Sequence, residues 1–197
     1  MTEPPKGFDR TLLLRDGRRV RVRPLTPQDA PELGEAIRNA DPETLRRRFC
    51  GSAPRVTPRL LERLTVLDYE RRFALVARSL EGPGVAVARY EATGRRMAEV
   101  AIAVAPAWRR VGLASALLHM LGLAALERGF ERFTAVYSAD NRPVAELLDY
   151  ARGRRVIAEG VAEAEVQLRD HPEAPPVTAP IPVAGPERRF SFFKPSQ

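Results

Sequence analysis

Residues 99–127, EVAIAVAPAWRRVGLASALLHMLGLAALE, form the part of the chain that decides the fold. The short apolar run at residues 100–104 predicts a buried strand. A turn with the small residues Gly112 and Ala114 follows, and the rest of the stretch is a long apolar segment that predicts a helix. At such a junction the first N–H groups of the helix lack partners, so the junction favours binding of an anion such as a phosphate.

The flanking segments predict the strands and helices that support this junction. Apolar or alternating runs predict further strands at residues 11–14, 18–25, 73–78, 85–90, 133–137, 154–158 and 162–168. Cap residues followed by proline predict helices at residues 27–39, 42–49, 58–67 and 142–150, and Gly129 ends the long helix over residues 110–128.

The order of these elements predicts an α/β (α+β) fold. Its centre would be a mixed, mostly antiparallel sheet of about seven strands flanked by helices. The strands at 73–78, 85–90 and 99–104 would form an antiparallel meander. The long helix would supply one parallel crossover, from the strand that begins at Glu99 to the strand at 133–137.

Composition narrows the class of protein. The 197 residues are 44% hydrophobic and 29% charged, which is typical of one globular domain with a real core. The net charge of +7 favours nucleic acid, an acidic partner or an anionic cofactor. Because the arginines are scattered and no basic block carries interleaved aromatic residues, we place nucleic acid below an anionic cofactor.

The two ends of the chain differ in composition from its centre. Residues 1–10 contain prolines, a glycine and charges, which predicts a loose N-terminus before a domain at residues 11–170. Residues 171–197 are rich in proline and predict an extended tail, which could act as a lid or as a strap in a homodimer. Without a signal-peptide core or a long apolar span, we expect a cytoplasmic protein that does not enter a membrane.

The single cysteine, Cys50, excludes an internal disulfide, and neither it nor the two histidines have metal-ligand spacing.

The turn Arg109-Arg110-Val111-Gly112-Leu113-Ala114 carries a family resemblance. It fits the pattern Gln/Arg-x-x-Gly-x-Gly/Ala, which resembles the acyl-CoA pyrophosphate loop of the GNAT superfamily of N-acetyltransferases. The span from Leu12 to Leu168 resembles, more closely, the GNAT domain of bacterial protein lysine acetyltransferases, and we expect it to stand alone, without a fused synthetase-like domain. The segments that carry this likeness are LRDGRRVRVRPLTPQDA, DPETLRRRF, LTVLDYERRFALVA, AEVAIAV and SADNRPVAELL.

The resemblance implies acetyl-CoA as co-substrate and assigns residues to it. The strand before the loop would splay from its neighbour and pair with the pantetheine arm through the backbone of Ile102, Ala103 and Val104, with an N–H near Ile102 or Ala103 polarising the thioester carbonyl. The loop would hold the diphosphate, and Asn141 would bind pantetheine or position the next helix. The loop residues concerned are Arg109, Arg110, Val111, Gly112, Leu113, Ala114 and Ser115.

The same resemblance assigns catalytic roles. Glu99 matches the glutamate that such lysine acetyltransferases use as a base, and burial beside apolar residues would suit it to that role. The position of the family's acid tyrosine holds Leu148, and Ser138 is our candidate for protonating the leaving thiolate. Each of these residues also has a structural alternative: Glu99 as a solvated strand end, the loop arginines as a solvated turn, and Ser115 and Asn141 as helix caps.

The resulting prediction is an N-acetyltransferase that moves the acetyl group directly to an amine, with a protein lysine as the favoured acceptor. Two alternatives stay open at this point. One is a non-catalytic regulatory module that binds acyl-CoA, which the missing tyrosine favours. The other is an acetyltransferase for a small-molecule amine.

Overall fold

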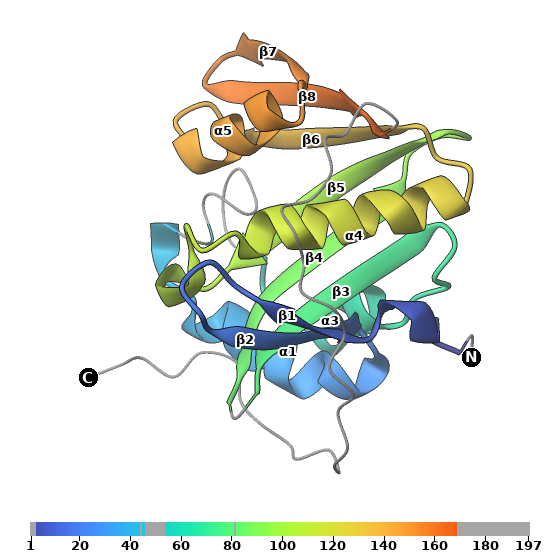
Figure 1. Cartoon of the computed structure of the whole chain (residues 1–197), viewed down its shortest axis with the longest axis vertical. Helices are drawn as coiled ribbons and strands as arrows, with labels where there is room; N and C mark the ends of the chain where they lie inside the picture. Colours follow the sequence, from blue (N-terminus) through green and yellow to red (C-terminus); the bar gives the residue numbers. More distant parts are fainter. Residues whose placement is uncertain (1–2, 44, 46–53, 81, 169–197) are drawn as a thin grey trace.

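The protein is an open eight-stranded sheet with helices on both faces (Figure 1). The computed structural model describes residues 3–43, 45, 54–80 and 82–168. The strand order is β1-β2-β3-β4-β5-β6-β8-β7, and all neighbours are antiparallel except β5 and β6, which are parallel. The strands are β1 (Arg10–Leu13), β2 (Arg19–Pro24), β3 (Arg72–Ser79), β4 (Gly84–Ala92), β5 (Met97–Val104), β6 (Arg132–Ser138), β7 (Arg154–Ala158) and β8 (Val161–Gln167).

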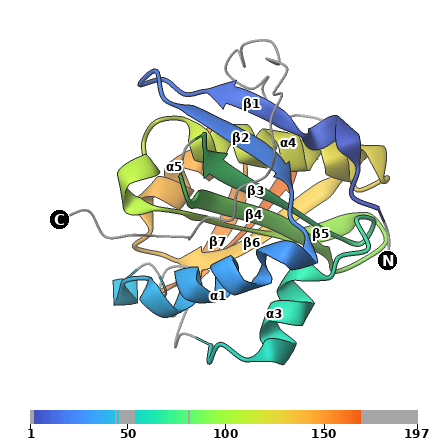
Figure 2. The same cartoon turned by 90° about the horizontal axis from the view of Figure 1, so that it is seen from below.

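The helices divide between the two faces of the sheet. Figure 2 shows α4 above the sheet and α1 and α3 below it. The helical elements are η1 (Lys6–Phe8), η2 (Pro27–Asp29), α1 (Ala30–Asn39), α3 (Pro58–Thr65), η3 (Pro106–Trp108), α4 (Leu113–Glu127) and α5 (Arg142–Tyr150). The mixed sheet, the meander β3-β4-β5 and the parallel crossover through α4 are therefore confirmed. Cys50, most of the helix expected at 42–49 and the tail at 171–197 lie outside the described residues.

Phe8 packs the segment that precedes β1 against the sheet. Phe8 is buried, and its ring packs edge-to-face on the ring of Phe73, with 5.1 Å between the ring centroids. Burying a phenylalanine side chain contributes roughly 1.5–3 kcal/mol, which is enough to hold a short segment against the sheet. The looseness of residues 1–10 as a whole stays a prediction.

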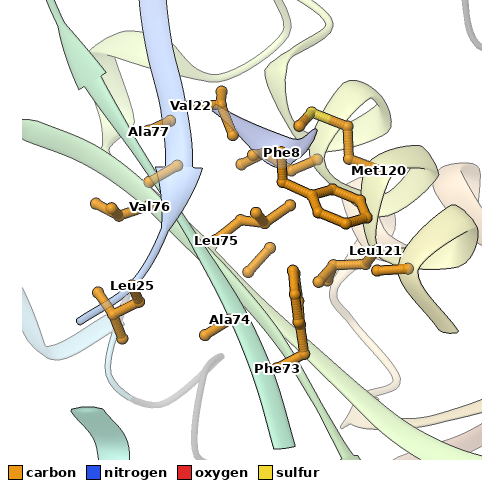
Figure 3. Close-up of a cluster of buried hydrophobic side chains, with 14 of the residues drawn as sticks. Phe8, Val22, Leu25, Phe73, Ala74, Leu75, Val76, Ala77, Met120 and Leu121 are labelled. Atoms are coloured by element: carbon orange, nitrogen blue, oxygen red, sulfur yellow. The ribbon is translucent and has the colours of Figure 1, made fainter. Parts of the chain in front are cut away.

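The main core lies between the sheet and α4. Alternate side chains of the central strands point to this face, as strand geometry requires, and Figure 3 shows Val22 and Leu75 facing Met120 and Leu121. The ring of Phe73 stacks on Tyr90 at 5.8 Å. This packing fixes α4 on the sheet, and with it the loop that precedes the helix.

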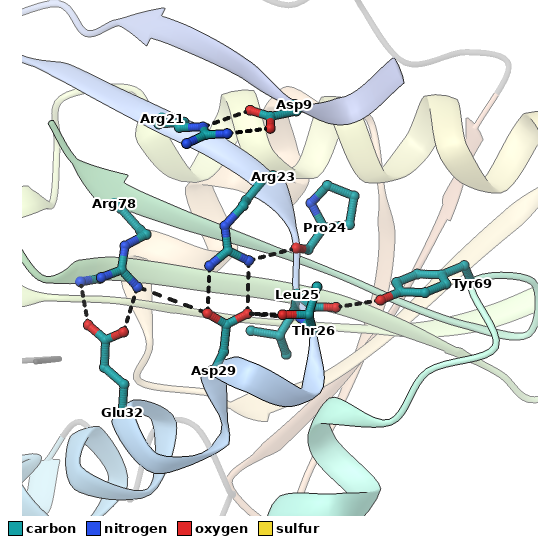
Figure 4. A network of polar contacts seen from close by, with 11 residues as sticks. Asp9, Arg21, Arg23, Pro24, Leu25, Thr26, Asp29, Glu32, Tyr69 and Arg78 are labelled. Carbon is teal, nitrogen blue, oxygen red and sulfur yellow. Dashed lines mark hydrogen bonds and ion pairs between the residues drawn. The ribbon is translucent and has the colours of Figure 1, made fainter. Parts of the chain in front are cut away.

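A buried ion-pair network holds the opposite face (Figure 4). Arg23 of β2 donates two hydrogen bonds to Asp29, at 2.6 and 2.9 Å, and the Thr26 N–H donates a third at 2.8 Å. Arg78 of β3 pairs with Glu32 of α1 beside them. Burial opposes ionisation of Asp29, but Arg23 and Thr26 outweigh it and hold the pKa of Asp29 below its ordinary value. The start of α1 is thereby tied to two strands.

Asp29→Asn is expected to lower the free energy of unfolding at neutral pH by about 1.5–3 kcal/mol, because Arg23 loses its charged partner. Since the folded-state pKa of Asp29 is lowered, its contribution is complete above the unfolded value of about 4 and is lost as the pH falls through the folded value. Urea unfolding of both proteins over this range measures the effect. The difference between them should shrink as the solution is acidified.

Asp9→Asn supplies a matched control, because the partner of Asp9, Arg21, lies on the same strand as Arg23. Asp9 makes the same two-bond contact with Arg21, at 2.7 and 2.9 Å, but at the protein surface. Surface pairs contribute about 0–1 kcal/mol and are screened by salt, so the expected loss is small. An equal loss in the two variants would contradict burial as the source of the effect.

Candidate active site

The sheet opens into a fork between β5 and β6 (Figure 1). The parallel pairing is confined to Met97, Ala98 and Glu99 opposite Arg132, Phe133 and Thr134. Beyond Glu99 the two strands diverge, while β5 stays paired with β4 as far as Val104. Among the described residues, no strand pairs with this edge of β5 beyond Glu99, so the edge can take an extended ligand as an additional strand.

Glu99 lies at the apex of this fork. Its register partners are Glu91 on β4 and Thr134 on β6, and its side chain is on the face opposite that of buried Ala98. Glu99 is exposed at the point where the sheet opens, so the burial that would suit it to the role of base is not observed. Arg63 pairs with the neighbouring Glu91 at 3.2 Å, whereas Glu99 has no hydrogen bond or ion pair to another described side chain. Its carboxylate is therefore open to an incoming cation.

The open edge of β5 contains the residues predicted to contact pantetheine. Ile102 and Val104 pack their side chains against the main core, which directs Ala103 to the other face. All three residues are half-buried rather than fully buried, and none of the strands that the structure describes covers the second edge of β5 at these positions. Backbone N–H groups alternate between the two edges of a strand, so one of Ile102 and Ala103 directs its N–H into the fork.

The loop before α4 has the backbone geometry of an anion site. Gly112 is the N-cap of α4 with φ +88°, and no described side chain caps this 15-residue helix. Arg110 also has a positive φ, of 65°, which is uncommon for a side-chain-bearing residue and stores strain. Val111 lies between them with ordinary backbone angles and packs against the core, so its branched side chain fits the loop. The first N–H groups of α4, at Leu113, Ala114 and Ser115, receive no side-chain cap from the described residues and lie at the positive end of the helix dipole.

The two loop arginines are held by the protein itself. The Nε of Arg109 donates to the Val104 carbonyl at 3.1 Å, and Arg110 pairs with Glu146 of α5. Their predicted contact with phosphate stays a prediction, but each already fixes the loop to a wall of the fork. Ser115 is in the first turn of α4 and does not cap it, so the capping alternative is not observed.

The turn between β1 and β2 also lies against the loop, which the sequence did not indicate. The Arg15 N–H donates to the Val111 carbonyl at 3.2 Å. Arg18 donates to the Ala107 carbonyl at 2.9 Å and stacks over Trp108 at 4.0 Å. The motif Asp16-Gly17 predicted a hairpin turn, but nothing local in the sequence could predict what the turn would touch.

The helix α5 places the remaining predicted residues. Asn141 is at its N-cap position and is 6% exposed, but its side chain makes no capping hydrogen bond. Ser138 ends β6 and donates to Asp140 at 2.6 Å. At the usual rise of a strand it lies about 13 Å along β6 from Thr134, so the backbone does not bring Ser138 beside Glu99. Leu148, at the tyrosine position, packs on Tyr137 in a small apolar cluster.

None of the described helices is long and apolar enough to cross a membrane. Within the same part of the chain, no group of three or more histidine, cysteine, aspartate or glutamate residues is arranged to hold a metal ion.

The chain is similar to several known acetyltransferases. The profile of the family described as "Acetyltransferase (GNAT) domain" matches residues 19–151. An acetyltransferase of Pseudomonas aeruginosa is 33% identical over 138 residues, which cover 68% of this chain and 74% of that protein. Acetyltransferase Pat of Mycolicibacterium smegmatis is 33% identical over 139 residues, and the match covers 69% of this chain and 41% of that relative. The crystal structure of the GNAT domain of S. lividans PAT matches with a TM-score of 0.77 and 31% identity, over 84% of this chain and 99% of that domain.

The family match over residues 19–151 spans the fork, the loop before α4 and α5. The family uses acetyl-CoA. The negative charge of its diphosphate complements the uncapped N-terminus of α4, and its extended pantetheine arm complements the open edge of β5. The chain therefore belongs to the GNAT family and is an N-acetyltransferase.

Proposed function

We propose that this N-acetyltransferase transfers the acetyl group of acetyl-CoA directly to the side-chain amine of a lysine in a protein. The observation that carries the proposal is Glu99, an exposed carboxylate without a cationic partner among the described residues, at the apex of the fork. The resemblance to bacterial protein lysine acetyltransferases favours lysine as the acceptor. A lysine ammonium fits a free carboxylate both in charge and as a proton donor.

Binding of the donor would divide between two elements. The uncapped N–H groups of α4 would hold the diphosphate, with Gly112 allowing close approach of the backbone. The open edge of β5 at Ile102, Ala103 and Val104 would pair with the amide groups of the pantetheine arm. Together these contacts direct the thioester towards the apex of the fork.

The chemistry would need one group that accepts a proton and one hydrogen-bond donor that stabilises the oxyanion. Glu99 would take a proton from the lysine ammonium, and the free amine would attack the thioester carbon. An N–H of Ile102 or Ala103 would stabilise the negative charge on the carbonyl oxygen. Collapse of the tetrahedral intermediate breaks the C–S bond, and the attacking nitrogen loses its second proton to water to give the neutral amide. The CoA thiolate takes a proton from water, either directly or through Ser138, whose hydroxyl is then reprotonated by water. No covalent intermediate with the enzyme is required.

The test is thiol release from acetyl-CoA in the presence of lysine-bearing proteins, with acetyl-lysine located by mass spectrometry. We expect release that depends on both enzyme and acceptor, and acetylation at lysine side chains. Acetylation of free amines alone would replace the protein lysine with a small-molecule acceptor. Binding of acetyl-CoA without thiol release for any amine would contradict the proposal.

A further inference from the structure

The turn of the β1–β2 hairpin is fixed beside the candidate diphosphate loop by contacts at both ends of that loop. Arg18 holds η3 through the Ala107 carbonyl, at 2.9 Å, and through the ring of Trp108, at 4.0 Å. The Arg15 N–H holds the other end through the Val111 carbonyl, at 3.2 Å. Figure 1 shows this turn beside the segment that leads into α4. The position of Arg15 relative to the loop is therefore set by the backbone.

The side chain of Arg15 continues along the N-cap of α4. A β-carbon built on Gly112 would lie 3.4 Å from Nε of Arg15, 3.6 Å from Cγ and 3.7 Å from Cδ. The Arg15 stem therefore covers the glycine from one side. The guanidinium is consequently within a side-chain length of the uncapped N–H groups.

Arg15 differs from the other arginines around the loop. Arg18 pairs with Asp16 at 2.6 Å, Arg110 pairs with Glu146, and Arg109 donates to Val104. Arg15 forms no ion pair or side-chain hydrogen bond with any residue that the structure describes. It is thus the one guanidinium of these four whose donors are all available to a ligand.

We propose that Arg15 binds the diphosphate of acetyl-CoA, and that the β1–β2 turn is a wall of the donor site. This inference rests on the proposed use of acetyl-CoA. The guanidinium would donate to phosphate oxygens from the side opposite the helix N–H groups, a geometry that suits its planar fork of donors. Gly112 then has two roles, because it adopts the left-handed backbone and leaves room for the Arg15 stem.

Arg15→Gln should raise the Kd for acetyl-CoA about 10- to 100-fold, as expected for loss of hydrogen bonds to a charged group. Arg15→Lys keeps the charge but not the planar set of hydrogen-bond donors, and it should give a smaller rise in the Kd. Arg19→Gln is the matched control, because it removes the same charge from the same hairpin. Arg19 is next to buried Val20, so its side chain lies on the face of β2 opposite that of Val20. Isothermal titration calorimetry measures the three Kd values, and unfolding without ligand verifies that each variant is folded.

Donor fragments identify the phosphate that Arg15 contacts. The rise in Kd caused by Arg15→Gln should persist with acetyl-dephospho-CoA, which lacks only the 3′-phosphate. With S-acetylpantetheine, which lacks the diphosphate, Arg15→Gln and the wild type should have the same kcat/KM. A penalty that disappears with acetyl-dephospho-CoA, or that remains with S-acetylpantetheine, would overturn the assignment. So would an equal Kd for wild type and Arg15→Gln, with acetyl-CoA use intact. If the wild type itself fails to bind acetyl-CoA, the proposed function fails first.

Discussion

Replacing Glu99 with glutamine lowers kcat for acetyl transfer by about 10²- to 10⁴-fold, the usual contribution of a general base. Glutamine keeps the size and the hydrogen-bonding character of the side chain but cannot accept the ammonium proton. The Kd of acetyl-CoA should stay unchanged, because the donor contacts lie on the loop before α4 and on the edge of β5 beyond the apex. Single-turnover thiol release at saturating acetyl-CoA separates the chemical step from binding.

Glu91→Gln is the control for this prediction. Glu91 is the register partner of Glu99 on β4 and shares its face of the sheet, but it is paired with Arg63 at 3.2 Å. Its replacement removes the same charge from a neighbouring position and should change kcat no more than a few-fold. If both variants lose activity equally, the negative charge of the face matters rather than a base at Glu99. Unchanged thiol release in Glu99→Gln would remove Glu99 from the mechanism.

The strands and helices could be predicted because their signals are local. The alternation in β2, with Val20 and Val22 buried and arginines between them, indicates a strand regardless of its neighbours. Likewise Thr57 caps α3 through the Leu60 N–H, and Gly129 ends α4 with a φ of +79°, both as the sequence indicates. Such rules hold because the residues involved interact within a few positions of one another.

The site was predicted less completely because its decisive contacts are long-range. The sequence located Glu99 on a strand, but its exposure follows from where β5 leaves β6, which depends on the packing of both strands. Asn141 shows the same limit: its position before Pro143 predicted a side-chain cap, yet the side chain is buried and does not cap α5. Arg15 was missed because nearly the whole chain between β1 and α4 separates it from the loop it touches.

Gly112→Glu should raise the Kd of acetyl-CoA at least about 100-fold, the second large effect expected for this site. It brings a carboxylate to the helix end that would hold the diphosphate, and apposed like charges cost several kcal/mol. It also forces a side chain into a backbone of φ +88° beside the Arg15 stem, at a further cost of about 1–3 kcal/mol to folding.

Gly129→Glu separates these two costs. Gly129 has a similar φ of +79° and lies at the opposite end of α4, and a β-carbon there would meet nothing within 4 Å. Both variants should lose stability without ligand, but saturating acetyl-CoA should raise the Tm of Gly129→Glu as it does that of the wild type. Gly112→Glu should show almost no rise. An equal ligand-induced shift in the two variants would mean that the diphosphate does not bind at the N-terminus of α4, since backbone strain is common to both and only the place of the charge differs.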